Sequence, residues 1–334
     1  MKTILVTGGL GYIGSHTVVE LINSGYEPII VDNLSNTSID VLNRIEQISH
    51  KKCVFYPIDV CIKEALSGVF DQHSIDGVIH FAAFKAVGES VEQPLKYYQN
   101  NIGGLITLLE VMQEKGVKNI VFSSSCTVYG EPDSSPVNEL STIKKANSPY
   151  GNTKQIGEEI LSECGFLNCV ALRYFNPIGA HSTALIGELP LGVPNNLMPY
   201  ITQTAIGIRE QLTIFGNDYD TLDGTCIRDY IHVVDLADAH VKALAFIKNY
   251  PENKFDVFNI GTGEGYSVLD IVNTFQKENN VSLKFVFGPK RAGDIMQVWA
   301  DNNKANSHLH WQAKYTLSDM VKSAWQWQLA LQKS

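Results

Sequence analysis

Three residues with the chemistry of a proton-transfer site lie in two short stretches of the chain. Tyr150 and Lys154 are one turn apart at the start of a predicted helix, so both side chains share one face. An ammonium group beside a phenol favours the phenolate and lowers the tyrosine pKa from about 10, giving a base usable near neutral pH. Chance also produces this spacing, but Ser125 follows the end of a predicted strand, where open α/β sheets bind their ligands. Its hydroxyl can bind the oxygen that Tyr150 deprotonates.

A glycine-rich motif, TGGLGYIG at residues 7–14, follows an apolar run and opens a predicted helix. Such glycines allow a tight turn and a bare backbone beside a pyrophosphate, which the helix N-terminus binds. Asp32 closes the next predicted strand, and its carboxylate suits a free ribose diol while repelling a 2′-phosphate. No arginine follows it in residues 33–36. The motif therefore predicts NAD rather than NADP.

The elements that would position these groups alternate between short apolar strands and amphipathic helices. The predicted strands are 4–7, 28–32, 53–59, 77–82, 119–123 and 169–174, and the predicted helices are 15–24, one from about residue 63, 94–115 and 150–164. This alternation predicts an α/β fold with a Rossmann-type doubly wound parallel sheet, covered by helices on both faces.

The second half of the chain has a different texture. Residues 177–230 are rich in Gly, Pro and Asn, and a loop-rich segment of this length is usually functional. The segments beyond it predict a strand at 231–234, a helix at 236–248, a smaller α/β set formed by 257–260, 268–278 and 283–287, and a last helix at 317–331. We therefore expect a nucleotide-binding domain over residues 1–176 with a return segment at 231–256, and a smaller C-terminal α/β substrate domain over 177–334.

Composition excludes several other classes of protein. Of the 334 residues, 44% are hydrophobic and 18% are charged, which is unlike a disordered chain. A net charge of −9 without a long basic run argues against nucleic acid or an anionic membrane as partner. No apolar run approaches the ~18–20 residues that span a bilayer, and the start of the chain lacks a signal-peptide core. Six cysteines without C-x-x-C spacing and nine histidines without metal spacing predict no metal site and a cytoplasmic protein with reduced thiols.

Longer motifs, spread nearly from end to end, carry a resemblance to a known family. They are TGGLGYIGSH, DNLSN, HFAAFKAVGES, FSSSCTVYG, SPYGNTK, LRYFNPIGAH, PNNLMPY, IFGNDY, RDYIHVVDLADAH and WAD. In these motifs the chain resembles the UDP-glucose 4-epimerases of the extended short-chain dehydrogenase/reductase family. The resemblance implies an isomerase of galactose metabolism that interconverts UDP-glucose and UDP-galactose through a 4-keto intermediate, with NAD bound throughout. It also implies a homodimer formed through the helices near 97–115 and 150–164.

The resemblance assigns roles to individual residues. Tyr150 would take the proton of the sugar 4-OH, Lys154 would hold the nicotinamide ribose and depress the Tyr150 pKa, helped by the positive nicotinamide ring, and Ser125 would bind O4. The cofactor residues would be Gly8, Gly11, Tyr12, Ile13, Gly14, Asp32, Asn33, Asn36, Ser38, Asp59, Val60, Phe81, Ala82, Lys85, Asn100, Tyr150, Lys154 and Tyr174. The UDP-sugar residues would be Ser125, Tyr150, Asn176, Asn196, Leu197, Phe215, Arg228, Arg291, Asp294 and Val298.

One position departs from the family pattern. Val298 stands where the family often has a bulky tyrosine that bounds the pocket near the sugar C2 substituent. A smaller side chain leaves room for an N-acetyl group, which predicts activity on UDP-GlcNAc and UDP-GalNAc as well; a neutral packing change is the other interpretation.

Related activities remain as alternatives. Sugar-nucleotide 4,6-dehydratases share the fold and the Tyr/Lys pair, but they carry an Asp-Glu pair where this chain has Cys126 and Thr127. A UDP-glucuronate decarboxylase is a second enzyme alternative. A non-catalytic NAD-sensing regulator would be expected to lose Tyr150, Lys154 or the substrate-side arginines, and all of these are present.

Overall fold

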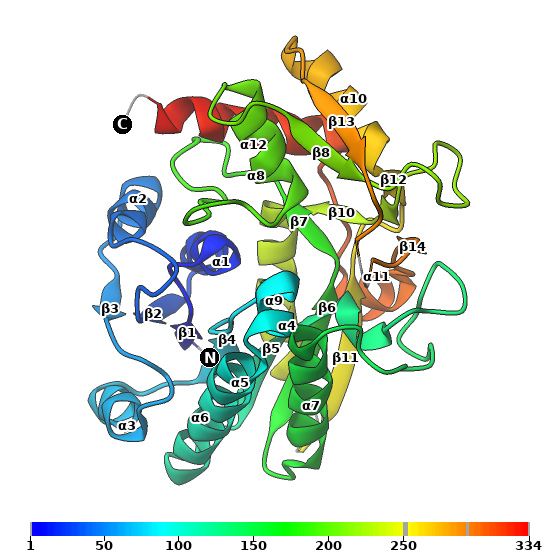
Figure 1. Cartoon of the computed structure of the whole chain (residues 1–334). Coiled ribbons are helices and arrows are strands. Elements are labelled where there is room, and N and C mark those ends of the chain that lie inside the picture. The colour runs from blue at the N-terminus through cyan, green and yellow to red at the C-terminus, as the bar shows by residue number, and fades with distance from the viewer. Residues whose placement is uncertain (1, 250–252, 292–293, 333–334) are drawn as a thin grey trace.

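The computed structural model describes residues 2–249, 253–291 and 294–332 and is built around one large parallel sheet (Figure 1). Its strands, from one edge to the other, are β11 (Phe255–Ile260), β6 (Asn168–Tyr174), β5 (Asn119–Ser125), β4 (Gly77–His80), β1 (Thr3–Thr7), β2 (Glu27–Val31) and β3 (Val54–Tyr56). All the neighbouring pairs are parallel. The order reverses between β1 and β4, as in the predicted Rossmann-type sheet, which is confirmed.

Helices cover both faces of this sheet, because successive strand residues point to opposite sides. In β1, Ile4 and Val6 pack in one apolar core and Leu5 packs in the other. The first face is covered by α1 (Tyr12–Asn23), α2 (Asp40–Ser49), α9 (Val233–Ile247) and α11 (Asn303–Leu309). The second face is covered by α3 (Lys63–Gln72), α6 (Gly103–Glu114) and α7 (Pro149–Glu163).

A smaller lobe stands over the carboxyl ends of the large sheet and has its own apolar core. It contains α8 (Leu197–Ala205), α10 (Val268–Asn279) and α12 (Leu317–Leu331), with the parallel pair β8 (Leu212–Phe215) and β13 (Phe285–Gly288). Short strands connect the lobes: β7 (Asn176–Ile178) pairs with β10 (Tyr230–His232), and β9 (Ile227–Arg228) pairs with β12 (Tyr266–Ser267) and β14 (Gln297–Val298). Trp325 and Trp327 of α12 are both buried.

Several elements differ from their sequence-based prediction. Helix α1 begins at Tyr12, three residues early, and α2 is not predicted. The predicted helix 94–115 is divided into α5 (Pro94–Tyr97), the π-helical turn η1 (Tyr98–Ile102) and α6, and it is preceded by α4 (Val87–Glu92). A 3-10 turn, η2 (Cys126–Tyr129), follows β5. The strand predicted at 257–260 is expected in the smaller α/β set. In the structure it is β11, which pairs with β6 at the edge of the large sheet.

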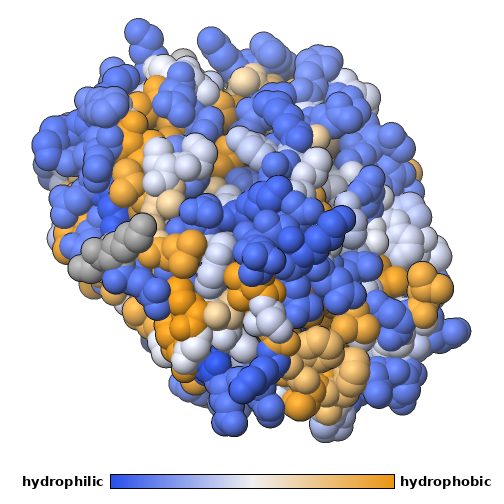
Figure 2. All heavy atoms as spheres, turned by 90° about the horizontal axis from the view of Figure 1, so that it is seen from above, coloured by the Kyte–Doolittle hydropathy of each residue, from blue (hydrophilic) through white to orange (hydrophobic). Residues whose placement is uncertain are grey.

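Figure 2 shows the face seen from above, where hydrophilic side chains cover most of the surface and hydrophobic side chains form separate patches. Among the described residues, no helix combines the length and apolar character that crossing a membrane requires. Within the same part of the chain, no three His, Cys, Asp or Glu side chains gather as a metal ion would require.

Candidate active site

A cavity of about 880 Å³ lies between the carboxyl ends of the large sheet and the smaller lobe. Every predicted catalytic, cofactor and substrate residue lines it except Ser38. The Ser38 hydroxyl instead bonds the Asp40 carboxylate at 3.1 Å, at the exposed start of α2. Its neighbours Asn36 and Thr37 line the cavity, so the predicted ribose-side loop reaches the site without Ser38.

The glycine loop leaves no room for side chains where it faces the start of α1. A Cβ atom on Gly14 would lie 2.2 Å from the Gly8 carbonyl oxygen, and one on Gly8 would lie 2.8 Å from the Ala82 nitrogen. Gly8 also has a φ of +69°, which favours glycine. The loop therefore brings bare backbone to the cavity beside the first turn of α1, whose N–H groups have no partner within the helix.

Asp32 is tied to this loop from the end of β2. Its carboxylate accepts hydrogen bonds from the backbone N–H groups of Leu10, at 3.1 Å, and Leu34, at 2.9 Å. Burial raises the pKa of Asp32, and the two backbone donors oppose that shift. The loop, the helix start and the carboxylate together fit the diphosphate and ribose of a dinucleotide.

The three predicted catalytic residues meet in the same cavity, because α7 packs against β5. Tyr150 and Lys154 lie on the first turns of α7, which begins at Pro149 and is capped by the Ser148 side chain at 3.2 Å from the Gly151 nitrogen. The ammonium group of Lys154 donates to the Ser123 carbonyl at 2.6 Å and lies 5.9 Å from the centre of the Tyr150 ring. Ser125 ends β5 and is hydrogen-bonded to Tyr150.

Protonation in the structure differs from the sequence-based expectation that Lys154 lowers the Tyr150 pKa. Burial raises the pKa of Tyr150 to about 12, and only the hydrogen bond with Ser125 works in the opposite direction among the causes. Burial also lowers the pKa of Lys154 to about 8, against the attraction of Glu158. The expectation is wrong for the protein by itself, because desolvation of the buried phenol raises the pKa of Tyr150.

A carboxylate links a predicted cofactor residue to a predicted substrate residue. The Lys85 ammonium and the Asn196 amide both bind the same oxygen of Glu188, at 3.1 and 2.6 Å. The backbone carbonyl of Glu188 accepts a further bond from the Trp327 indole at 2.9 Å. The segment that carries Glu188 therefore joins the cofactor side of the cavity to the smaller lobe.

The far end of the cavity carries aromatic and basic side chains from the smaller lobe. The guanidinium of Arg291 lies 4.9 Å from the centre of the Phe215 ring and bonds Asp294 at 2.9 Å. Arg228 donates to the Ile227 carbonyl at 2.8 Å and also lines the cavity. An arginine fork beside an aromatic face suits a diphosphate attached to a flat base.

Further residues of the site are not found by the sequence reasoning. Thr127, Tyr200 and Tyr230 line the cavity, and their nearness to Ser125, Leu197 and Arg228 in the motifs is the signal that could have found them. Asn101, in the π-helical turn, accepts from the Phe84 nitrogen at 2.9 Å and donates to Thr153 at 3.1 Å. Asn101 thereby attaches the loop after β4 to α7, which no short motif predicts.

Comparison with known proteins agrees with this geometry. A family model described as GDP-mannose 4,6 dehydratase matches residues 5–324. A UDP-glucose 4-epimerase of Bacillus subtilis (strain 168) is 52% identical over 97% of this chain and 96% of its own length. The chain belongs to the UDP-glucose 4-epimerase family.

Solved structures of this family superpose over the whole chain. The UDP-glucose 4-epimerase of Stenotrophomonas maltophila, with bound NAD and formylated UDP-arabinopyranose, has a TM-score of 0.97 and 45% identity, covering 100% of this chain and 99% of its own. A UDP-Glc/GlcNAc 4-epimerase of Campylobacter jejuni has a TM-score of 0.85 and 36% identity, covering 99% and 100%. The epimerase fold thus extends through both lobes.

Proposed function

We propose that this chain is an NAD-dependent UDP-hexose 4-epimerase that interconverts UDP-glucose and UDP-galactose. The observation that carries the proposal is the meeting of Tyr150, Lys154 and Ser125 with the glycine loop and Asp32 in a single cavity. The Bacillus subtilis and Stenotrophomonas maltophila epimerases support it, the latter with NAD and a UDP-sugar derivative bound.

The residues present fit NAD, since the glycine cradle has no space for a Cβ at Gly14 and Asp32 faces the cavity. NAD, when bound, supplies a reversible hydride acceptor and a positive ring. Gly8, Gly11 and Gly14 would hold the pyrophosphate, Asp32 the adenosine ribose, and Lys154 the nicotinamide ribose.

Proton transfer falls to Tyr150 in this proposal. Its phenol, with a pKa raised to about 12, stays protonated near neutral pH, and positive charge entering the cavity would stabilise the phenolate and make the base available only when the cofactor is bound. Ser125 would bind the sugar O4, and Tyr150 would take the proton of the 4-OH and return it to the 4-keto intermediate after the ring has turned.

The arginine-rich end would anchor the UDP group so that the sugar can turn. We assign Arg228, Arg291 and Asn196 to the diphosphate and Phe215 to the uracil side. Residues 1–176, with α9, β11 and α11, would hold NAD, and the smaller lobe would hold the UDP-sugar. With Val298 small, the same pocket would accept UDP-GlcNAc and UDP-GalNAc, and the Campylobacter jejuni relative, named for both substrates, supports this extension.

The matching family model is described as a dehydratase. A dehydratase needs an additional acid and base after Ser125. Cys126 and Thr127 occupy these places, and burial raises the pKa of the Cys126 thiol to about 12. These side chains favour epimerisation over elimination.

The test is product identification by NMR after incubating the purified protein with UDP-galactose, together with identification of the nucleotide released on denaturation. We expect UDP-glucose and NAD. A 4-keto-6-deoxy sugar would show a dehydratase, release of mainly NADP would refute the cofactor assignment, and no turnover with NAD bound would favour the sensing regulator.

We also propose a cytoplasmic homodimer. The apolar side chains of Val91, Leu95 and Ile106, on α4, α5 and α6, are at least 43% exposed, which supports pairing through this side of the molecule. Six free cysteines fit a reducing compartment. Light scattering of the wild type and of Ile106→Lys tests the dimer; a wild-type monomer refutes it.

A further inference from the structure

A buried ion pair lies directly behind the catalytic groups. Glu158 is one helical turn beyond Lys154 on α7, and its carboxylate accepts three hydrogen bonds from Arg173 of β6, at 2.9, 3.2 and 2.6 Å. The two residues are only 6% and 4% exposed. The pair is therefore almost fully desolvated and fixes the middle of α7 against β6.

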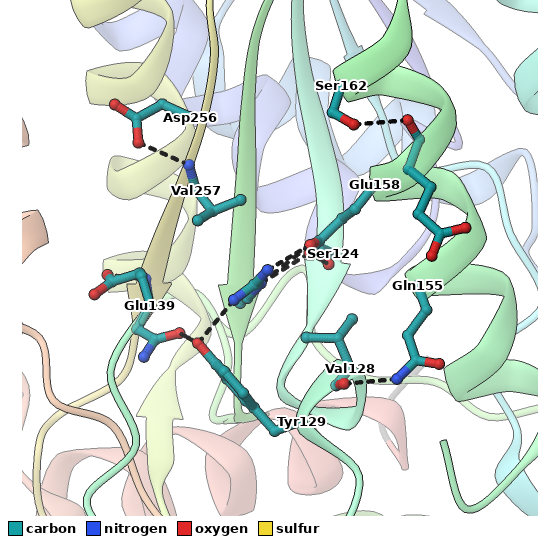
Figure 3. Close-up of polar contacts among 12 residues, drawn as sticks. Ser124, Val128, Tyr129, Glu139, Gln155, Glu158, Ser162, Asp256 and Val257 are labelled. Atoms are coloured by element: carbon teal, nitrogen blue, oxygen red, sulfur yellow. Dashed lines mark hydrogen bonds and ion pairs between the residues drawn. The ribbon is translucent and has the colours of Figure 1, made fainter. Parts of the chain in front are cut away.

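Each end of the pair continues into hydrogen bonds beside a cavity residue (Figure 3). The Ser124 hydroxyl, next to Ser125 on β5, donates to Glu158. Arg173, next to Tyr174, donates to the Tyr129 hydroxyl at 3.1 Å, and Tyr129 donates to Asn259 at 2.7 Å. The network therefore includes Ser124, which precedes Ser125, and Arg173, which precedes Tyr174. Its carboxylate, Glu158, lies on α7, the helix that carries Lys154.

Stability alone does not explain such a pair. Taking two charges out of water costs much of what their attraction returns, and well-packed apolar residues often replace buried ion pairs without loss. The arrangement is therefore better explained by what it does to its neighbour Lys154.

Lys154 is itself buried, at 4% exposure, and its charge depends on the groups around it. These are Glu158 and Tyr150 on α7, the Ser123 carbonyl on β5 and His80 on β4. His80 is neutral, since burial and the Lys154 charge lower its pKa to about 3. Burial lowers the pKa of Lys154 to about 8, and Glu158 raises it.

We propose that Glu158 is a positioning residue of the active site: its buried carboxylate, fixed by Arg173 one helical turn from Lys154, favours the ammonium form of Lys154. The catalytic part of this inference rests on the proposed function, in which the ammonium form of Lys154 is the working one. The charge of Lys154 can be measured without any activity, so the two proposals can fail separately.

The experiment compares Glu158→Gln, which removes the negative charge and keeps the shape, with Glu158→Gln/Arg173→Met, which leaves no unpaired guanidinium. Ser124→Ala is the matched control, since it removes a hydrogen bond and keeps both charges, and Glu158→Asp tests rescue. The titration of Lys154 is followed by NMR of ¹³Cε-lysine in the ligand-free protein, with its signal assigned through Lys154→Arg. The pH profile of kcat with UDP-galactose is measured in parallel.

We expect Glu158→Gln to move the Lys154 midpoint down by roughly one pH unit, the lower end of the effect of a nearby opposite charge, and the double variant to move it down by less, because Arg173→Met removes a positive charge as well. The alkaline limb of kcat should move down with it, while Ser124→Ala keeps the wild-type midpoint and Glu158→Asp restores most of the shift. An unchanged midpoint in the folded double variant overturns the proposal even if Glu158→Gln does not fold. A shifted midpoint in a protein without epimerase activity would support the charge assignment and refute the proposed function instead.

Discussion

Replacing Val298 by tyrosine tests what decides the sugar that this cavity accepts. Val298 is 3% exposed, lines the cavity from β14, and packs in a cluster with Val128, Tyr129 and Phe175. A tyrosine ring cannot enter this filled cluster without strain, so it must occupy cavity space. Overpacking of this kind costs about 1–3 kcal/mol, which corresponds to a loss of about 5- to 150-fold in kcat/KM, since 1.36 kcal/mol is tenfold.

The expected loss falls on the N-acetylated pair, because a filled site rejects the larger ligand. The assay measures kcat/KM for UDP-galactose and UDP-GalNAc in the wild type, Val298→Tyr and Val298→Ala, the last being a control that only enlarges the pocket. Val298→Ala should keep both activities. Equal losses on both substrates in Val298→Tyr, or no UDP-GalNAc activity in the wild type, would refute the reasoning.

Three further predictions concern the base, the glycine cradle and acid stability. Tyr150→Phe should lower kcat about 10²–10⁴-fold with little change in UDP affinity by calorimetry; near-normal turnover would assign the proton to another group. Gly14→Ala, whose Cβ would meet the Gly8 oxygen at 2.2 Å, should purify without NAD, while Gly68→Ala, with nothing within 4 Å, should retain it; equal NAD content would contradict the cradle. Buried His16, with a pKa lowered to about 3, is neutral in the fold and protonated in the unfolded chain below about pH 6.5. His16 alone should therefore lower the free energy of unfolding by up to about 1.4 kcal/mol per pH unit below pH 6.5, and His16→Gln should remove that share; equal losses of stability between pH 7 and pH 5 in the wild type and His16→Gln would contradict this.

The sequence predicts the elements with strong local signals. Helix α12 has the predicted bounds, and β6 and α7 lie within one residue of theirs, because apolar periodicity, Pro149 and the glycine stops are local features. Helix α2 is not predicted, although its apolar residues Val41, Leu42, Ile45 and Ile48 recur at helical spacing and pack in the first core. The π-helical turn is not predicted either. Its extra residue is set by Asn101, which bonds both the loop after β4 and α7.

Long-range placement and desolvation are what the sequence leaves open. Periodicity finds strand β11 but cannot tell that it pairs with β6, more than eighty residues earlier. Nearly every site residue that the motifs predict lines the cavity, yet the neighbouring Lys154 suggests a lowered Tyr150 pKa, while burial raises it. Burial depends on the whole fold around α7, which no spacing within the motif contains.

The return of β11 and α9 to the first lobe has a consequence for how this protein folds. Helix α9 packs on α1 in one apolar core, and β11 covers the edge of β6, although both follow the first stretch of the smaller lobe along the chain. A fragment ending at residue 176 would leave an open strand edge and an uncovered helix, so we expect it to aggregate instead of folding. The substrate lobe is therefore not one continuous piece of the chain, and its stretches lie on both sides of α9 and β11. The full chain should accordingly melt in one cooperative transition, with both lobes lost together.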